Sequence, residues 1–350
     1  MGEELGMRGR GDAAEKAFAV YFDQARELRL YKRAEAPQAG ESFDGGVAGV
    51  VMEGIEHEGF SWDSRARRAR RVAVVDEGIA PASAARWFQG FGQMTACDLA
   101  RLDTSNVDDM HRMFSGCRSL ERLDLSGLDT SGVVDMSWMF AHCAKLVSLD
   151  LSGIDASRVR DLSYAFCCCR SLERLDLSGI EAPSVETVCM MFSGCSSLGS
   201  VDLSGISASM VVDLSGMFEG CRSLRSLDLS GFDTSRVEDM SGTFSGCESL
   251  AGLDLSALRT SRVESMARMF KGCRRLRSLD LSAFDTSGVA DMRFMFKGCH
   301  ALASLDMSGL DLSGVERPWG MLDDCPSLTS EVVDDVVKGF SGRYRRAQIC

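Results

Sequence analysis

The chain has 350 residues, of which 45% are hydrophobic and 26% are charged, and it carries a formal net charge of −12. This apolar content excludes an intrinsically disordered chain, because it suffices to build a core. The acidic balance disfavours a nucleic-acid partner, since binding phosphates requires a basic face.

The first residues, MGEELGMRGRG, contain no apolar segment of the kind that a signal peptide requires. No stretch of the chain approaches the roughly 18 consecutive apolar residues of a membrane span. The sequence therefore predicts no export signal and no membrane-spanning helix, and we expect residues 1–13 to be disordered.

Residues 14–78 contain apolar runs of strand length but no repeated pattern. We expect a hairpin from residues 17–22 and 28–32, and further strands at 47–52 and 71–75. These strands predict a small β-rich N-terminal cap, because the open end of a repeat array needs covering.

Residues 79–328 repeat with a period of 26, as in the unit from Leu120 to Cys143, LERLDLSGLDTSGVVDMSWMFAHC. A fixed period of about 20 to 50 residues is typical of a solenoid, in which one small unit is stacked many times. The array predicts a linear core rather than the compact core of an enzyme.

Each unit predicts three short elements. Leu123, Asp124 and Leu125 alternate as in a strand, and such strands stacked about 4.8 Å apart would form a parallel sheet along the whole array. Residues 133–136 predict a second strand. Met136, Met139 and Phe140 then have helical spacing, with Ser137 as the expected N-cap. One phenylalanine per unit predicts a buried aromatic row: Phe114, Phe140, Phe166, Phe192, Phe218, Phe244, Phe270 and Phe296.

The apolar residues Val332, Val333, Val336, Val337 and Phe340 predict one face of an amphipathic helix. We expect residues 329–342 to form this helix as a C-terminal cap, followed by a basic tail at 343–350. The predicted fold class is therefore an α/β repeat solenoid, in which each 26-residue coil has short parallel strands and a short helix, with a cap at both ends.

One cysteine per unit forms what we call the cysteine ladder. Stacked thiols could bind soft metal ions or form a redox array. The ladder lacks CxxC pairs and histidine partners, however, so we interpret these residues as small buried hydrophobes. Cys167, Cys168, Cys189 and Cys350 lie outside it and are the thiols that we expect to react. The ladder comprises Cys117, Cys143, Cys169, Cys195, Cys221, Cys247, Cys273, Cys299 and Cys325.

One outward aspartate per predicted strand forms what we call the Asp column. Like charges about 5 Å apart repel by roughly 1 kcal/mol per neighbour in water, so something must offset them. Hydrogen bonds from neighbouring serines and turn amides, with help from Arg122 and Arg174, are the favoured explanation. Calcium is the less favoured one, because no calcium-binding loop is present. The column comprises Asp124, Asp150, Asp176, Asp202, Asp228, Asp254, Asp280 and Asp306.

No motif for catalysis or for a cofactor occurs in the sequence, and the four histidines occupy non-equivalent positions. The five arginines within residues 65–71 are more typical of a solvated loop than of a nucleic-acid or targeting site. We therefore expect a non-enzymatic binding protein whose flat face contacts a protein or a glycan. The candidate contact residues are Arg118, Arg122, Arg170, Arg174, Arg222 and Arg274.

The consensus of these units, LxxLDLSGxDTSxVxDMxxMFxGCxSL, resembles the 26-residue repeat of the BspA-like leucine-rich-repeat surface proteins of bacteria. The resemblance covers residues 79–328. It implies a leucine-rich-repeat-like solenoid that serves adhesion at the bacterial cell surface, or in a secreted form. Because this chain shows no signal peptide and no anchor, a cytoplasmic protein–protein interaction scaffold remains the alternative.

Overall fold

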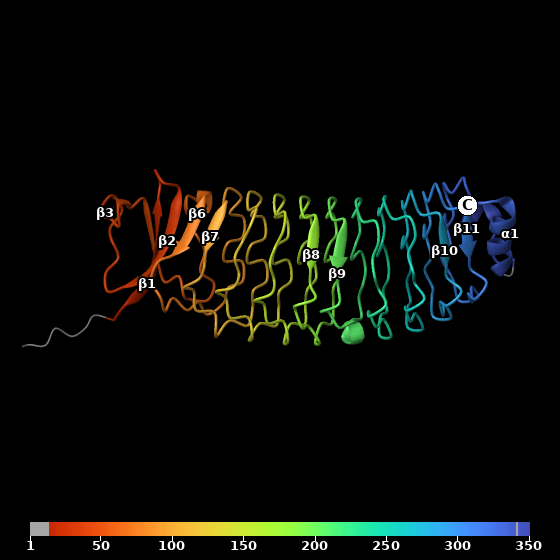
Figure 1. Ribbon diagram of the computed structural model, residues 1–350, viewed down its shortest axis with the longest axis horizontal. Coiled ribbons are helices and arrows are strands. Elements are labelled where there is room, and N and C mark those ends of the chain that lie inside the picture. Colours follow the sequence, from red (N-terminus) through yellow and green to blue (C-terminus); the bar gives the residue numbers. More distant parts are fainter. Residues whose placement is uncertain (1–13, 341) are drawn as a thin grey trace, which may run out of the picture.

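The structure is a computed structural model that describes residues 14–340 and 342–350. Residues 1–13, for which disorder is expected, lie outside the described part. The molecule is an elongated, gently arched stack of coils, with a small sheet at its N-terminal end and a helix at its C-terminal end (Figure 1). The expectation of a repeat solenoid of 26-residue coils is confirmed.

The N-terminal sheet has five strands in the order β5-β1-β2-β6-β7. Strands β1 (Lys16–Phe22) and β2 (Glu27–Arg33) form the expected antiparallel hairpin, and β5 (Val50–Glu53) pairs with β1. Strands β6 (Arg71–Val74) and β7 (Ala96–Asp98) then add in parallel. Since β7 already belongs to a coil, the sheet passes directly from the N-terminal segment into the solenoid.

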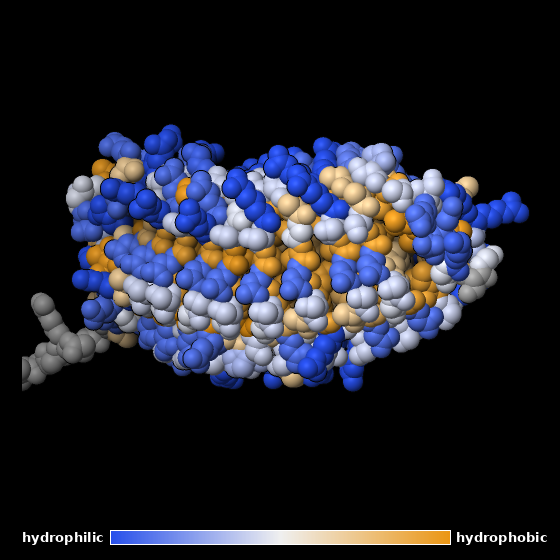
Figure 2. Space-filling view, turned by 45° about the vertical axis from the view of Figure 1, so that its right-hand side comes forward, coloured by the Kyte–Doolittle hydropathy of each residue, from blue (hydrophilic) through white to orange (hydrophobic). Residues whose placement is uncertain are grey.

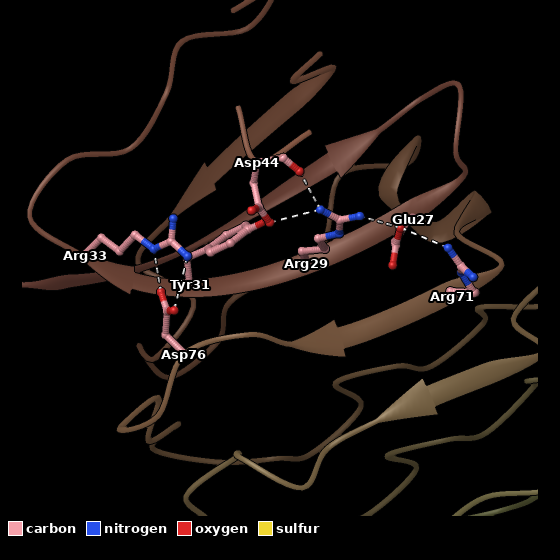
Figure 3. Close-up of polar contacts among 7 residues, drawn as sticks. All are labelled: Glu27, Arg29, Tyr31, Arg33, Asp44, Arg71 and Asp76. Carbon is pink, nitrogen blue, oxygen red and sulfur yellow. Dashed lines mark hydrogen bonds and ion pairs between the residues drawn. The ribbon is translucent and has the colours of Figure 1, made fainter. Parts of the chain in front are cut away.

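A polar network crosses the outer part of this sheet (Figure 3). The Arg29 guanidinium donates to Glu27 at 3.0 Å and to Asp44 at 2.9 Å, and the Tyr31 hydroxyl donates to Asp44 at 2.6 Å. Asp44 lies in the turn between β3 (Ser42–Phe43) and β4 (Gly46–Val47). The network therefore ties this small hairpin to the sheet.

The electrostatics of the network favour the ionised form of its carboxyl groups. The hydrogen bond from the Tyr31 hydroxyl holds the pKa of Asp44 below its ordinary value. Burial opposes ionisation of Glu27, but the hydrogen bond and the charge of Arg29 outweigh it and lower the pKa of this carboxyl. Burial raises the pKa of the Tyr31 hydroxyl, which stays protonated and can donate.

The coils contain less regular structure than the sequence predicts. Strand pairing within them is limited to β8 (Arg174–Asp176) with β9 (Ser200–Asp202) and to β10 (Ser278–Asp280) with β11 (Ser304–Asp306). The second predicted strand is reduced to single bridges, such as that between Asp109 and Asp135. The expectation of a sheet along the whole array is wrong for the described coils.

The prediction of a helix in each unit is also wrong, because successive turns occupy these residues. A short 3-10 helix, η2 (Ala208–Met210), lies at a different position within its coil. The Met113 N–H donates within its coil, to the Met110 carbonyl, whereas the Phe114 N–H donates to Met139 of the next coil, at 2.9 Å. An α-helix would use both groups internally. Alternate residues are instead bonded along the stack, which joins the coils.

The expected aromatic row is confirmed and extends to Phe88. Successive rings from Phe88 to Phe296 stack with centroids 5.5–6.0 Å apart and planes within 25° of parallel. Each ladder cysteine donates its thiol to the carbonyl of a phenylalanine one coil earlier, at 3.0–3.3 Å. The core is thus a set of continuous rows, and apolar side chains appear as a stripe along the stack between polar rows (Figure 2).

The C-terminal end is closed by two helices. Helix α1 (Ser330–Gly339) has Thr329 as N-cap and buries Val333 and Val336. Helix α2 (Arg346–Ile349) follows, and its carbonyls accept hydrogen bonds from backbone N–H groups of the last coil, as between Leu322 and Ile349 at 2.8 Å. The segment expected as a basic tail therefore docks on the open end of the stack. No described helix is long and apolar enough to cross a bilayer.

Candidate functional site

A row of bulky side chains occupies one backbone position in successive coils, and this position is left-handed throughout. Arg112, Trp138, Tyr164 and Met190 have φ of 56°, 58°, 59° and 51°. In the next two coils the same position is occupied by glycine, Gly216 and Gly242, with φ of 60° and 65°. Only glycine adopts this conformation without a steric penalty. We call the four bulky residues the ridge.

The ridge is a stack that lies partly at the surface. The rings of Trp138 and Tyr164 are 4.1 Å apart and 11° from parallel. The Arg112 guanidinium lies 5.0 Å from the centre of the Trp138 ring. All four side chains are half-buried, so each also contacts solvent. A cation over an indole adds about 0.5–1 kcal/mol at such a site.

The Asp column lies on the outward side of the strands, as expected, and its members are exposed. The Asp124 carboxylate accepts hydrogen bonds from the Ser126 N–H at 2.9 Å and from the Ser126 hydroxyl at 2.7 Å. The same N–H contact recurs throughout the column. These contacts, with the backbone amide first, lower the pKa of Asp124. Each carboxylate of the column thus accepts a hydrogen bond from a serine amide of its own turn.

Shallow hollows lie beside this column in several coils. One of about 320 Å³ is lined by Asp202, Ser204, Asp228 and Ser230 together with apolar side chains. Similar hollows of about 290 and 340 Å³ lie near Asp124 and near Asp306. The acidic face is therefore hollowed in places rather than flat.

The six arginines proposed as contact residues are all exposed. Arg122 and Arg174 lie on the outward strand face, two residues before members of the Asp column. Arg222 forms an ion pair of 3.6 Å with Glu248 of the next coil, and no ion pair joins the other five to any described residue. Among the described residues, no side-chain hydrogen bond or ion pair joins them to the ridge.

All fourteen cysteines are free. Burial raises the pKa of every ladder thiol, to about 12 at Cys143 and about 11 at Cys325, so the ladder is protonated near pH 7. Of the four thiols expected to react, Cys167 and Cys168 lie 3.7 Å apart, and Cys350 is exposed. The Cys189 Sγ lies 3.2 Å from the Ser215 hydroxyl.

A cluster of metal-ligating side chains lies near the N-terminal end of the stack. One ligand atom from each of Asp109, His111 and Asp135 lies within 4.8 Å of the other two, and this is the one such cluster in the described part of the chain. Asp109 and His111 also line a cavity of about 560 Å³, to which residues 57–62 of the N-terminal segment contribute His57. Two of the four histidines, His57 and His111, thus line the same cavity.

Neither the ridge nor this cluster is anticipated by the sequence reasoning. The signal for the ridge is a position at which some repeats have glycine and others have arginine, tryptophan or tyrosine. The signal for the cluster is the single histidine in a column that otherwise has serine in four coils: Ser137, Ser163, Ser215 and Ser241.

Comparison with known proteins places the repeats in a family. The model of the family described as "Mycoplasma protein of unknown function, DUF285" matches residues 82–205 and 212–335, which is more than half of the chain. No curated protein is significantly similar in sequence.

Several solved structures are similar to the chain at low sequence identity. A leucine-rich repeat protein from Bacteroides ovatus is 15% identical, with 84% of this chain and 88% of that chain covered and a TM-score of 0.33. The functional domain of InlJ from Listeria monocytogenes, described as including a cysteine ladder, is 11% identical (78% and 70% covered, TM-score 0.25). The pneumococcal vaccine antigen PcpA is 13% identical (96% of each covered, TM-score 0.32).

Proposed function

We propose that this chain, which belongs to the family described as Mycoplasma protein of unknown function, DUF285, is a non-catalytic solenoid that binds a protein partner at a bacterial cell surface. The elongated stack supports a binding role, since solenoids present extended surfaces to macromolecules (Figure 1). The location rests on the resemblance of the repeat to those of the BspA-like surface proteins. The single observation that carries the choice of partner is the ridge.

The fold does not require the ridge side chains. A left-handed conformation costs a residue other than glycine roughly 1–2 kcal/mol. The stacking of an aromatic pair such as Trp138 and Tyr164 stabilises the folded protein by only about 0.5–1.5 kcal/mol. Coils with Gly216 and Gly242 at this position show that the stack forms without such side chains. Bulky side chains that the fold does not require, gathered in adjacent coils at a conformational cost, support a role in recognition.

The chemistry of the ridge favours a protein over a glycan. A sugar ring packs against the free face of an aromatic ring, but Trp138 is covered by Arg112 on one side and by Tyr164 on the other. The ridge therefore offers the edge of the Trp138 ring, a guanidinium and a thioether. Trp, Tyr and Arg are the residue types that dominate binding energy in protein–protein interfaces.

The test compares two surfaces of the same protein. Trp138→Gly combined with Tyr164→Gly removes the ridge and places glycine where Gly216 and Gly242 stand in other coils. Phe294→Gly is the matched control, because Phe294 occupies the same left-handed position, with φ of 58°, at the far end of the stack.

We expect saturable binding of the labelled protein to cell surfaces, and loss of this binding when those surfaces are treated with protease. The ridge variant should bind about 30-fold more weakly, which corresponds to about 2 kcal/mol for an interface hot spot, and the control should bind as the wild type does. Equal binding by the ridge variant, or binding that protease spares and glycosidase abolishes, would refute the proposal.

The free cysteines favour a second candidate, the intracellular interaction scaffold. Reduced thiols are typical of a reducing compartment. A membrane-impermeant maleimide applied to intact cells separates the two, with Cys350→Ser as control. Labelling that depends on Cys350 supports surface display, whereas labelling only after lysis supports the scaffold.

A further inference from the structure

We propose that Asp109, His111 and Asp135 bind a divalent transition-metal ion, with Zn²⁺ as the representative case. The proposal concerns the N-terminal end of the stack and is independent of the ridge. It rests on the geometry of the cluster, on a comparison with equivalent positions in other coils, and on the adjoining cavity.

The three side chains are already arranged around a common point. Their ligand atoms lie within 4.8 Å of one another, whereas ligands of a tetrahedral zinc ion are about 3.3 Å apart. Small side-chain rotations therefore suffice to close the site. The His111 Nδ1 lies 2.8 and 3.0 Å from the two Asp109 oxygens, so both side chains already direct ligand atoms toward the same place.

The backbone holds both carboxylates in place. The Asp109 Oδ1 accepts the His111 N–H at 2.9 Å, and the Asp135 Oδ1 accepts the Ser137 N–H at 2.8 Å. Each carboxylate is thereby anchored through one oxygen, as supporting hydrogen bonds anchor the ligands of known metal sites. The two residues come from adjacent coils joined by a bridge, so the fold itself sets their separation.

The charge environment of Asp109 and Asp135 differs from that of Asp291. Asp291 occupies the same position as Asp109, seven coils later, and its carboxylate is paired with Arg293 at 2.8 Å and with Arg317 at 3.5 Å. Among the described residues, Asp109 and Asp135 have no arginine or lysine partner within ion-pair distance. Two adjacent carboxylates facing one imidazole are the arrangement that a divalent cation neutralises.

The donor set selects the class of ion. Calcium and magnesium take oxygen ligands, whereas an imidazole with two carboxylates suits zinc, cobalt or manganese. The cavity of about 560 Å³ gives the ion a path to the site and leaves room for water. His57 and Glu58 line the same cavity and are the residues from which a fourth ligand would come. A bound ion would then join the N-terminal segment to the stack.

The experiment is calorimetric titration of Zn²⁺ into the full chain. His111→Ser is the test variant, because serine occupies the equivalent position in four other coils and preserves the local turn. Asp135→Thr is a second variant, chosen because Thr187 stands at the same position two coils later. The Thr187 hydroxyl accepts the N–H of Cys189 just as the Asp135 carboxylate accepts that of Ser137. His300→Ser, which changes a histidine outside the cluster, is the control.

We expect the wild type and His300→Ser to bind one equivalent of zinc with the same affinity. Both test variants should bind this equivalent at least tenfold more weakly. Co²⁺ in place of Zn²⁺ should give a visible spectrum without a thiolate charge-transfer band, which separates this site from the cysteines. Absence of saturable binding by wild type, or equal zinc uptake by His111→Ser, would overturn the proposal.

Discussion

Truncation of one ring in the aromatic row tests how the stack is held together. Phe218 is 1% exposed and lies between Phe192, 5.5 Å away, and Phe244, 6.0 Å away. Phe218→Ala leaves a cavity in the middle of the core, which costs about 3–5 kcal/mol for a buried phenylalanine. Loss of two stacked contacts places the expected value in the upper part of that range.

The free energy of unfolding is measured by urea titration, with hydrogen exchange of the amides in adjacent coils as a local readout, because arrays do not always unfold in one step. Phe294→Ala is the matched control, since Phe294 is only half-buried. We expect it to cost less than half as much. A cost below about 1 kcal/mol for Phe218→Ala would refute the reasoning, because the row would then not be the core.

The stack, its thiols and its carboxylates lead to four further predictions. Deletion of residues 195–220, one full period, should leave a folded and slightly less stable protein by circular dichroism; a globally unfolded product would contradict the modular stack. A thiol reagent at neutral pH should label Cys350 readily and the ladder only after denaturation, because burial raises the ladder pKa values; rapid labelling of the ladder in the native protein would oppose this account. Millimolar calcium and chelator should give the same melting temperature, since serine amides satisfy the Asp column; a rise with calcium would revive the ion-binding interpretation. Stability should fall on acidification below about pH 4.5. The pKa values of Glu27 and Asp44 are lower in the folded protein than their ordinary values of 4.5 and 3.8. The two carboxylates therefore contribute fully to stability above their ordinary pKa values, and this contribution is lost as the pH falls through their lower pKa values in the folded protein. Asp44→Asn should reduce this pH dependence of the melting temperature, and an unchanged dependence would argue against the network.

The features predicted well from the sequence are those that the 26-residue period repeats. Every coil has an apolar residue at the position of Phe218, so identical surroundings force the rings into one row. The helix prediction is wrong because a spacing of three and four residues, as from Met136 to Met139 and Phe140, fits successive turns equally well. What decides between them is the bond from Phe114 to Met139 of the next coil, which has no counterpart in the local sequence.

The candidate sites could not be predicted from the sequence, because they too depend on relations between coils. The ridge consists of residues that differ from coil to coil, so a consensus removes them. The backbone angle at Trp138 explains why glycine occupies the same position in other coils. The cluster of Asp109, His111 and Asp135 combines two columns from adjacent coils. Its proximity depends on side-chain directions that residue spacing does not provide.

The dimensions of the molecule in solution test the central claim, that coils superimpose residue upon residue. The eight steps of the Phe row alone give the core a length of about 45 Å, to which both ends add. Small-angle X-ray scattering should therefore give an asymmetric pair-distance distribution with a long tail. Its radius of gyration should lie well above the roughly 20 Å of a compact domain of this length. A symmetric distribution with a radius near 20 Å would contradict the stack.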